Sequence, residues 1–215
     1  MIRGIVLAAG ASTRMGQAKA ALPFGHTGET IVSQVVRTML RGGVPDVTVV
    51  AGAHIDAVRG AMPSHEPRAR VIEHADWQLG QLSSLLKGLD AIDHPLLEAA
   101  VVTLVDVPMV LPSTVSAVIA EWRRTRAPII RPASSAQGAQ GAENAERHGH
   151  PVIFDRSVFA DLRTADLGVG AKAVFAKYRD RVVNVEVEDP GAFEDIDTPG
   201  EYERMQGTWD LGLGS

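Results

Sequence analysis

The chain has 215 residues, no cysteine and a formal net charge of −5 at pH 7. This length suits one α/β domain with a substantial core and is short for two independent domains. The acidic balance argues against a nucleic acid partner, since proteins that bind the phosphate backbone carry clustered, excess Lys and Arg. The lack of cysteine excludes disulfides, thiolate metal sites and cysteine nucleophiles, and it fits a reducing cytoplasm.

The N-terminal residues Ile2–Leu7 are apolar and rich in β-branched side chains, and they predict a first strand that is buried on both faces. The stretch is too short and wrongly flanked for a signal peptide. No other stretch approaches the roughly 20 apolar residues of a membrane span. We therefore expect a soluble, cytoplasmic protein without a membrane partner.

The loop after this strand carries the strongest functional signal, Leu7-Ala8-Ala9-Gly10-Ala11-Ser12-Thr13-Arg14-Met15-Gly16-Gln17-Ala18-Lys19. Its small residues let backbone N–H groups approach a ligand, and Gly10 and Gly16 can adopt conformations forbidden to other residues. Arg14 adds a guanidinium that can donate two hydrogen bonds to one phosphate, and Lys19 adds a compact positive charge. Together they suit the binding of a triphosphate. The loop is neither a P-loop nor a dinucleotide fingerprint, which disfavours kinases and dehydrogenases. A surface turn with two solvated cations is the alternative interpretation.

Strands and helices alternate along the rest of the chain. Helical spacing predicts helices over Ile31–Leu40, Leu82–Leu89 and Pro112–Trp122, and further buried strands are predicted over Val47–Val50, Ala100–Val105, Pro128–Arg131 and Val182–Val187. This alternation predicts an α/β fold: one Rossmann-like domain over residues 1–206, with a mostly parallel sheet and helices on both faces. Ligands of such sheets bind beyond the carboxyl ends of the strands.

The second predicted helix is preceded and opened by Gly80-Gln81-Leu82-Ser83-Ser84-Leu85. Neither serine has a sequence neighbour that would activate it, so we expect no nucleophilic serine. The two serines are expected either to cap the helix or to contact a nucleotide.

Two aspartates are candidates for a cation site. Asp106 directly follows the strand Ala100–Val105, at the sheet edge where a cation that bridges phosphates would lie. Mg²⁺ prefers one or two carboxylates and completes its octahedron with water and phosphate oxygens. Asp197 is the second candidate. The sequence Thr198-Pro199-Gly200-Glu201 after it has the form of a capping box, so Asp195 and Asp197 could alternatively serve only to organise a helix start.

Two segments lack apolar periodicity. Residues 133–147 are rich in Ala, Gln, Gly, Ser and Glu and predict a mobile loop. Residues 207–215 predict a loosely held C-terminal tail without a clear element.

The seven histidines show no His-x-x-x-His spacing, so a zinc site is weakly supported. His150 differs from the others because Gly149 and Pro151 on either side of it fix the local chain.

Together these motifs resemble the MobA-like NTP transferases, and especially their molybdenum cofactor cytidylyltransferases. The resemblance spans residues 5 to 202 and rests on five motifs in family order: the loop 7–19, Gly80 to Leu85, Asp106-Val107-Pro108, Gly149-His150-Pro151 and Asp195-Ile196-Asp197-Thr198-Pro199. It implies a fold of the nucleotide-diphospho-sugar transferase type. It also implies that CMP is transferred from CTP to molybdopterin carrying molybdenum, with release of pyrophosphate. A molybdoenzyme that receives the finished cofactor is then a possible partner.

The same resemblance assigns roles to individual residues. The nucleotide would bind at Leu7, Ala8, Ala9, Gly10, Arg14, Gly16, Lys19, Gly80, Gln81, Ser83 and Ser84. Arg14, Lys19 and Asp106 would act in catalysis, and Asp106 and Asp197 would hold Mg²⁺. His150 would lie beside the acceptor, with a purely structural role equally open. No general base is expected, because a phosphate-bearing acceptor is already an anionic nucleophile.

The sequence departs from the family near the acceptor motif. Related cytidylyltransferases carry Gly-Asp-x-Gly-Ala-Arg where this chain has Leu167-Gly168-Val169-Gly170-Ala171-Lys172, so that Gly168 fills the aspartate position and Asp166 comes two residues early. The segment 133–147 is also longer and less patterned than its family counterpart. Both differences indicate altered acceptor specificity.

Several other functions stay open. Guanylyl-transferring relatives have Leu-Ala-Gly-Gly in place of Leu7-Ala8-Ala9-Gly10, and the Ala9 methyl would limit the approach of a purine, so we expect CTP rather than GTP. Cytidylyltransferases for sugar phosphates or isoprenoid precursors have a similar opening loop. A non-catalytic nucleotide sensor or a molybdoenzyme assembly factor is the alternative of another class, and the presence of both Asp106 and Lys19 argues against it.

Overall fold

The centre of the sheet is β1 (Ile2–Ala8), which is buried along almost its entire length because apolar side chains occupy both of its faces. It pairs in parallel with β2 (Val47–Ala51) on one side and with β4 (Ala99–Leu104) on the other, and β3 (Ala69–Glu73) extends the sheet beyond β2. The structure is a computed structural model that describes residues 1–25, 28–134 and 147–210.

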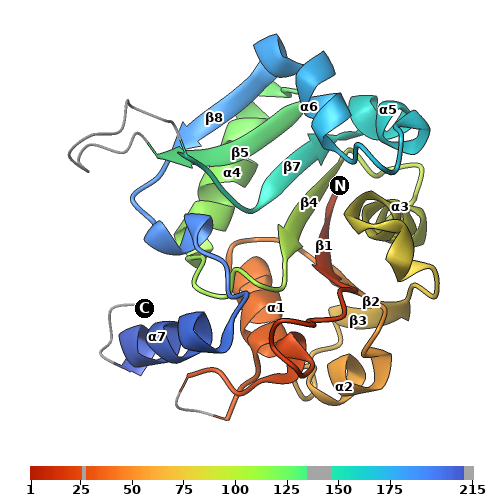
Figure 1. Cartoon of the computed structure of the whole chain (residues 1–215). Coiled ribbons are helices and arrows are strands. Elements are labelled where there is room, and N and C mark those ends of the chain that lie inside the picture. Colours follow the sequence, from red (N-terminus) through yellow and green to blue (C-terminus); the bar gives the residue numbers. More distant parts are fainter. Residues whose placement is uncertain (26–27, 135–146, 211–215) are drawn as a thin grey trace.

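The other half of the sheet contains antiparallel pairs. β7 (Val152–Asp155) runs antiparallel between β4 and β5 (Ile129–Ser134). β5 pairs in parallel with β8 (Val182–Glu186) and antiparallel with the short β6 (Arg147–His148). The described strands therefore form one eight-stranded, mostly parallel sheet in the order β3-β2-β1-β4-β7-β5-β6, with β8 also on β5 (Figure 1).

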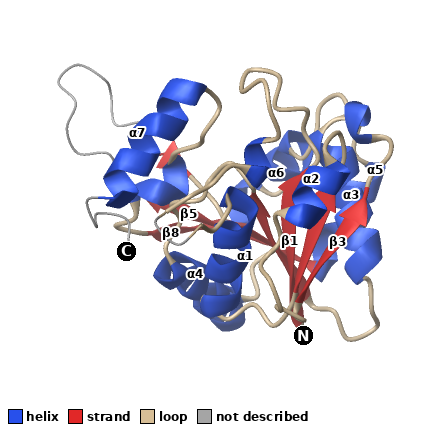
Figure 2. Ribbon diagram, turned by 90° about the horizontal axis from the view of Figure 1, so that it is seen from below, coloured by secondary structure: helices blue, strands red, loops and turns tan. Residues whose placement is uncertain are grey.

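Helices cover both faces of this sheet and create two hydrophobic cores (Figure 2). On one face, α1 (Ile31–Arg41) and α4 (Pro112–Thr125) bury apolar side chains, joined by Val58 of α2 (Ile55–Gly60) and Met205 of α7 (Pro199–Asp210). On the other face, α3 (Gln81–Ile92), α5 (Phe159–Thr164) and α6 (Lys172–Lys177) do the same. No helix of the described residues is long and apolar enough to cross a bilayer.

The predicted α/β architecture is confirmed, and every strand and helix predicted from the sequence is present with small shifts at its ends. The prediction that each strand is buried on both faces is wrong for β8. Its residues are only partly buried, because it pairs with a single neighbour, β5, among the described strands.

The two segments without apolar periodicity are only partly described. Ala133 and Ser134 complete β5 and Arg147 begins β6, whereas the rest of the predicted loop, 135–146, lies outside the described residues. Helix α7 continues to Asp210, into the segment 207–215 where the sequence predicted no element, and residues 211–215 lie outside the described residues.

Candidate active site

A cavity of about 410 Å³, which we call the charged cavity, opens where β1 and β4 end. Most residues expected to bind a nucleotide or a metal line it: Leu7, Ala8, Ala9, Gly10, Arg14, Lys19, Gly80, Gln81, Ser84, Asp106 and Asp197. Gly16 is not among the lining residues. It lies in the turn of the loop with a φ of +68°, a conformation that favours glycine.

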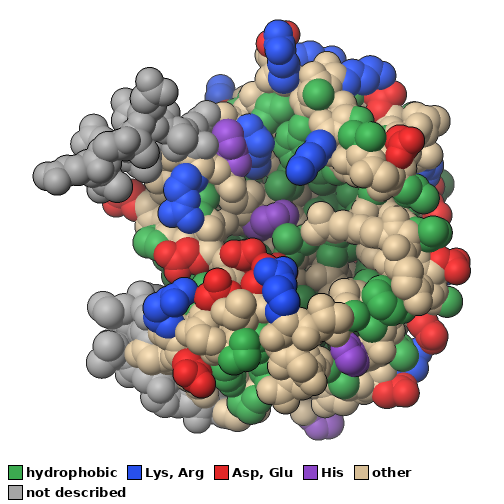
Figure 3. Space-filling view, in the orientation of Figure 1, with side chains coloured by type: hydrophobic (Ala, Val, Ile, Leu, Met, Phe, Trp, Pro, Cys, Tyr) green, Lys and Arg blue, Asp and Glu red, His purple; other side chains and the backbone are tan. Residues whose placement is uncertain are grey.

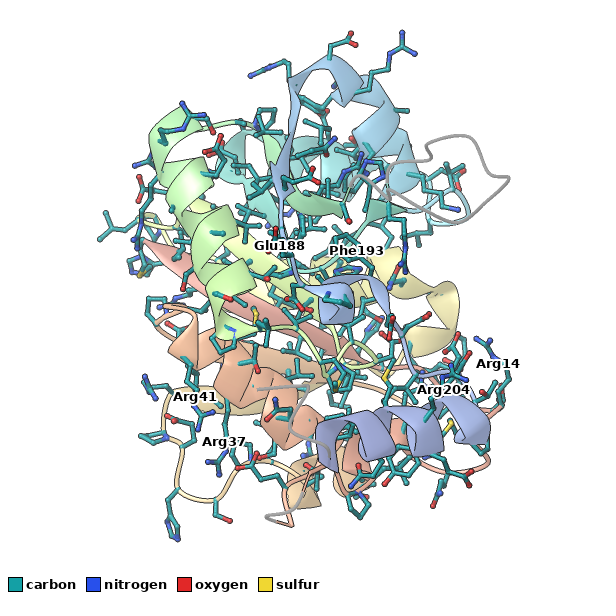
Figure 4. The ribbon with its side chains drawn as sticks, turned by 90° about the vertical axis from the view of Figure 1, so that its left-hand side faces the viewer. Arg14, Arg37, Arg41, Glu188, Phe193 and Arg204 are labelled. Atoms are coloured by element: carbon teal, nitrogen blue, oxygen red, sulfur yellow. The ribbon has the colours of Figure 1, made fainter. Side chains whose placement is uncertain are left out.

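Lys19 joins the two aspartates of this cavity. Its side chain is buried, and Nζ lies 2.9 Å from Oδ1 of Asp197 and 3.5 Å from Oδ2 of Asp106. Arg14 approaches Asp197 from the other side, with Nη2 2.7 Å from Oδ2. Figure 3 shows acidic and basic side chains gathered beside a hollow near the middle of this face, and Figure 4 shows Arg14 next to α7. The structure thus brings together four charged candidates from three distant parts of the chain.

Backbone hydrogen bonds place Asp197 opposite Asp106. The amide of Ile196 donates to the carbonyl of Asp106 at 2.8 Å. Glu201 accepts from the amides of Asp197 and Thr198 at 2.9 and 2.8 Å, and Thr198 Oγ1 accepts from the amide of Glu201 at 3.3 Å. Thr198 and Glu201 therefore form the capping box that the sequence predicts. The Asp197 carboxylate is directed instead at Lys19 and Arg14.

The two carboxylates have opposite electrostatic surroundings. Burial raises the pKa of Asp106, an effect that Lys19 opposes and that Asp195 and Asp197 reinforce. The hydrogen bond from Lys19 lowers the pKa of Asp197. Oδ1 of Asp106 is buried without a hydrogen-bond partner, which is costly for a carboxylate unless a ligand satisfies it.

This donor set fits a hard divalent cation. Within residues 1–25, 28–134 and 147–210 there is no group of three or more His, Asp and Glu side chains that could hold a metal ion. A cation here would take the two carboxylates and complete its shell with non-protein oxygens, as Mg²⁺ does. The partnerless Oδ1 of Asp106 is the atom that such a cation would satisfy.

The turn into α3 is held by a buried histidine that sequence reasoning missed. His74, directly after β3, lies with Nε2 2.9 Å from Oγ of Ser83. Ser83 Oγ in turn donates to the carbonyl of Gly80 at 2.7 Å, so His74 is the donor of the first bond. Burial lowers the pKa of His74, which favours the neutral ring. Ser83 lines neither cavity and makes no N-terminal side-chain cap, whereas Ser84 lines the charged cavity.

A second cavity of about 500 Å³, the apolar cavity, lies beside the first. Four residues line both: Leu7, Gly80, Gln81 and Leu104. Aromatic and aliphatic side chains dominate the remaining wall, including Phe154 and Phe175, whose rings meet edge to face at 5.8 Å. The shared residues make the two cavities adjacent, so that together they form a candidate site with a charged half and an apolar half.

His150, the expected acceptor-side residue, lines the apolar cavity. Its Nδ1 is buried without a hydrogen-bond partner, and burial lowers the pKa of His150 to about 4, so the ring is neutral at pH 7. Its backbone is fixed by a bond from the amide to the carbonyl of Ala192 at 2.9 Å. Gly149 is required at this approach, because a Cβ there would lie 2.1 Å from the same carbonyl oxygen.

Four other lining residues were assigned no role from the sequence. His54 and Trp77 line the charged cavity, and Arg131 and Lys172 line the apolar one. His54 follows β2 and could have been found from its place at a strand exit, as Asp106 was. The other three stand in a 3-10 helix, a strand and a helix that only the folded chain brings to the cavities.

Comparison with known proteins identifies the domain family of this chain. Residues 4–182 match the model of the MobA-like NTP transferase domain. Nicotine blue oxidoreductase of Paenarthrobacter nicotinovorans is 32% identical over 206 residues, covering 95% of this chain and 96% of that protein. Purine catabolism protein PucB of Bacillus subtilis is 30% identical over 209 residues, covering 94% and 95%.

Among solved structures, Rv0371c of Mycobacterium tuberculosis is 28% identical with a TM-score of 0.75, covering 96% of this chain and 98% of that one. The same mycobacterial protein has also been solved as a complex with manganese, at a TM-score of 0.71 over the same shares of the two chains.

Proposed function

The chain belongs to the MobA-like NTP transferase family, and from that premise we propose that it transfers CMP from CTP to the phosphate of a molybdopterin-type cofactor. The observation that carries this proposal is the adjacency of the two cavities: a charged half suited to a nucleoside triphosphate lies beside an apolar half suited to an organic acceptor. An acceptor phosphate oxygen forms a bond to the α-phosphorus of CTP, the bond from that phosphorus to the bridging oxygen breaks, and pyrophosphate leaves.

In this proposal the charged cavity holds the nucleotide. The backbone of Leu7 to Gly10 and the turn at Gly80 and Gln81 face the base and sugar, with Ser84 beside them. Lys19 and Arg14 neutralise the triphosphate and the leaving pyrophosphate, for which they exchange part of their contact with Asp197 for phosphate oxygens. The conformation of Gly16 supports the loop, and Ser83 supports the turn through Gly80.

Asp106 and Asp197 are the residues that would hold Mg²⁺. The bound cation would supply charge neutralisation of the phosphates and a fixed orientation for them. The manganese complex of the mycobacterial relative supports a divalent cation in this fold.

No side chain needs to remove a proton from the acceptor, because a phosphate monoester is already an anionic nucleophile at neutral pH. The protein therefore accelerates the reaction by holding two anions in contact and stabilising the charge that develops. On the acceptor side, the neutral ring of His150 offers its unsatisfied Nδ1 to the bound acceptor.

CTP is the proposed donor because Ala9 lines the charged cavity at the strand exit. Its methyl narrows the space beside the backbone, and a pyrimidine needs less space than a purine. The rival donor is GTP, and rival acceptors are sugar phosphates and isoprenoid precursors.

A pyrophosphate-release assay with CTP, GTP, ATP and UTP, each combined with molybdopterin-type and sugar-phosphate acceptors, tests the proposal. We expect release with CTP and the molybdopterin-type acceptor only, dependent on Mg²⁺. Release with another pair reassigns the substrates, and no release with any pair supports a non-catalytic assembly factor. Because one relative is named an oxidoreductase, NADH and NADPH oxidation is measured in parallel. We expect none, since the loop after β1 lacks Gly-x-Gly-x-x-Gly.

A further inference from the structure

The apolar cavity carries charge of one sign only. Among the described residues that line it, Arg131 and Lys172 are the charged ones, and none is Asp or Glu. The charged cavity, in contrast, is lined by two cations and two carboxylates. The wall of the apolar cavity combines aromatic and aliphatic side chains with two cations and has no carboxylate. Such a wall favours a ligand that is negatively charged but has a largely apolar body.

The two cations enter from elements away from the nucleotide loop. Arg131 lies on β5, which is separated from β1 by β4 and β7 in the sheet, and Lys172 is the first residue of α6 (Figure 1). Neither belongs to the four residues that line both cavities. They are therefore placed for a group of the acceptor other than the phosphate that must meet the nucleotide at the junction.

Arg131 is held in place by its neighbours. Its Nε donates to Oδ1 of Asn184 at 3.0 Å, and its guanidinium lies over the ring of Phe175, 5.3 Å from the centroid. Lys172 is exposed and has no hydrogen-bond or ion-pair partner within the part of the chain that the structure describes. A positioned guanidinium and an uncommitted ammonium together form a receptor for an anion.

The loop before α6 adds no carboxylate to the wall of the apolar cavity. Oδ1 of Asp166 accepts from the amides of Gly168 at 2.7 Å and Val169 at 3.3 Å, so that carboxylate stabilises its own loop. Leu167 and Val169 are 39% and 55% exposed and line the cavity at its rim. Gly168, in the position where related sequences have aspartate, adds no side chain to the wall.

The buried Nδ1 of His150 without a partner is an independent sign that a ligand belongs in this cavity. We propose that the acceptor carries a second anionic group besides its reactive phosphate, that Lys172 and Arg131 bind this group, and that the acceptor's apolar body packs against Phe154 and Phe175. This inference rests on the proposed transfer to a phosphorylated acceptor and narrows the chemistry of that acceptor.

A binding experiment tests the second anion without requiring turnover. Two rigid probes are compared by calorimetry, biphenyl-4-yl phosphate and its analogue with a carboxylate at the far 4′ position, each titrated into protein saturated with a non-hydrolysable CTP analogue. The carboxylated probe is expected to bind wild type about three- to tenfold more tightly, as partly exposed ion pairs allow. Added salt should reduce this advantage.

Variants identify the cations responsible. Lys172→Gln should reduce the advantage of the carboxylate to near one, and Arg131→Gln should reduce it in part. Lys177→Gln is the matched control on the same helix, because Lys177 pairs with Asp161 and lines neither cavity. Equal affinity of the two probes for wild type, or an advantage that survives both Lys172→Gln and Arg131→Gln, overturns the inference.

Pyrophosphate release with the molybdopterin-type acceptor separates this result from the proposed function. A carboxylate advantage without any release would leave the anion site standing and remove the transferase proposal. Release without a carboxylate advantage would do the reverse.

Discussion

The charged and apolar cavities are neighbours but are stabilised in different ways. In the charged cavity, Lys19 pairs with both Asp106 and Asp197, and Arg14 pairs with Asp197, so each of these charges has an ion-pair partner before any ligand arrives. In the apolar cavity, Nδ1 of His150 has no hydrogen-bond partner, and Lys172 has none among the described residues. The difference indicates that the nucleotide half is an interdependent network, whereas the acceptor half keeps polar groups for its ligand. Changes in the first half should affect every reaction, and changes in the second half should depend on the acceptor.

The largest effect is expected for Asp106→Ala, which removes one side of the network. The variant should fold, because the backbone carbonyl of Asp106 still accepts from Ile196, and it should lose turnover with every acceptor. Asp180→Ala, at an exposed aspartate, is the control and should behave as wild type. Wild-type rates for a folded Asp106→Ala at saturating Mg²⁺ would refute the metal role of Asp106.

Lys19→Ala should lower kcat by roughly 10²–10³ for all acceptors, because it removes a charge contact that is stronger in the transition state. Steady-state kinetics with and without raised CTP would show whether the loss lies in kcat. A modest rise in KM alone would mean that Lys19 binds ground and transition states equally. Lys87→Ala, on an exposed face of α3, provides the control.

The neutral His150 of the apolar half predicts a pH effect on stability, to which the buried His74 adds in the same direction. Its pKa is about 4 in the folded protein against an ordinary 6.5, so between these values the unfolded chain binds a proton that the folded chain does not. The contribution of the neutral His150 to the free energy of unfolding is fully present above about pH 6.5. It falls as the pH decreases toward 4, by at most about 3 kcal/mol. Thermal unfolding of wild type and His150→Gln across this range measures it, and the variant should show a shallower decline. The exposed His94→Gln should keep the wild-type slope.

The preference for CTP over GTP is expected to depend on Ala9, in the charged half of the site. Ala9→Gly should relax the preference for CTP over GTP by about 1–3 kcal/mol without inverting it, as a single methyl allows. The ratio of kcat/KM for the two nucleotides in both proteins is the measurement, with Gln81 and Leu82 as candidates for the remaining discrimination. A wild type that already favours GTP would remove both the steric explanation and the cytidylyl assignment.

The smallest effect is expected from the hydrogen bond between His74 and Ser83, which holds the turn at Gly80. His74→Leu should weaken CTP binding about two- to tenfold, since losing one buried hydrogen bond costs roughly 0.5–1.5 kcal/mol. The effect should fall on KM more than on kcat, and His74→Gln, which retains a donor, should restore part of the affinity. Unchanged CTP affinity in a folded His74→Leu would show that Ser83 holds the turn by itself.

The two halves also differ in how far the sequence predicts them. The strand and loop of residues 2–19, the strand that ends before Asp106 and the capping box at Thr198 and Glu201 are local patterns, and the structure has all of them. The role of His74 was not predicted, because its partner Ser83 belongs to α3, nine residues further on. In addition, the apolar alternation of β3 is too weak to predict where this strand ends.

Apart from His150 and the segment 167–172, the wall of the apolar half could not be predicted, because it is assembled by tertiary pairing. β7 has only four residues, and the sequence does not reveal that it runs antiparallel between β4 and β5. That insertion brings Phe154 and Arg131 to one wall, where α6 adds Phe175 and Lys172. Periodicity predicts whether such residues lie in a helix or a strand, but it does not predict which other element each side chain contacts.

The pairing of Lys19 with Asp197 has a consequence for biosynthesis. The two residues are separated by 178 positions, so during synthesis the loop 7–19 leaves the ribosome long before Asp197 is available to pair with it. Domains fold only when their long-range partners are available. A nascent or truncated chain that ends before Asp197 therefore presents the opening loop without the carboxylate that Lys19 and Arg14 contact in the folded protein.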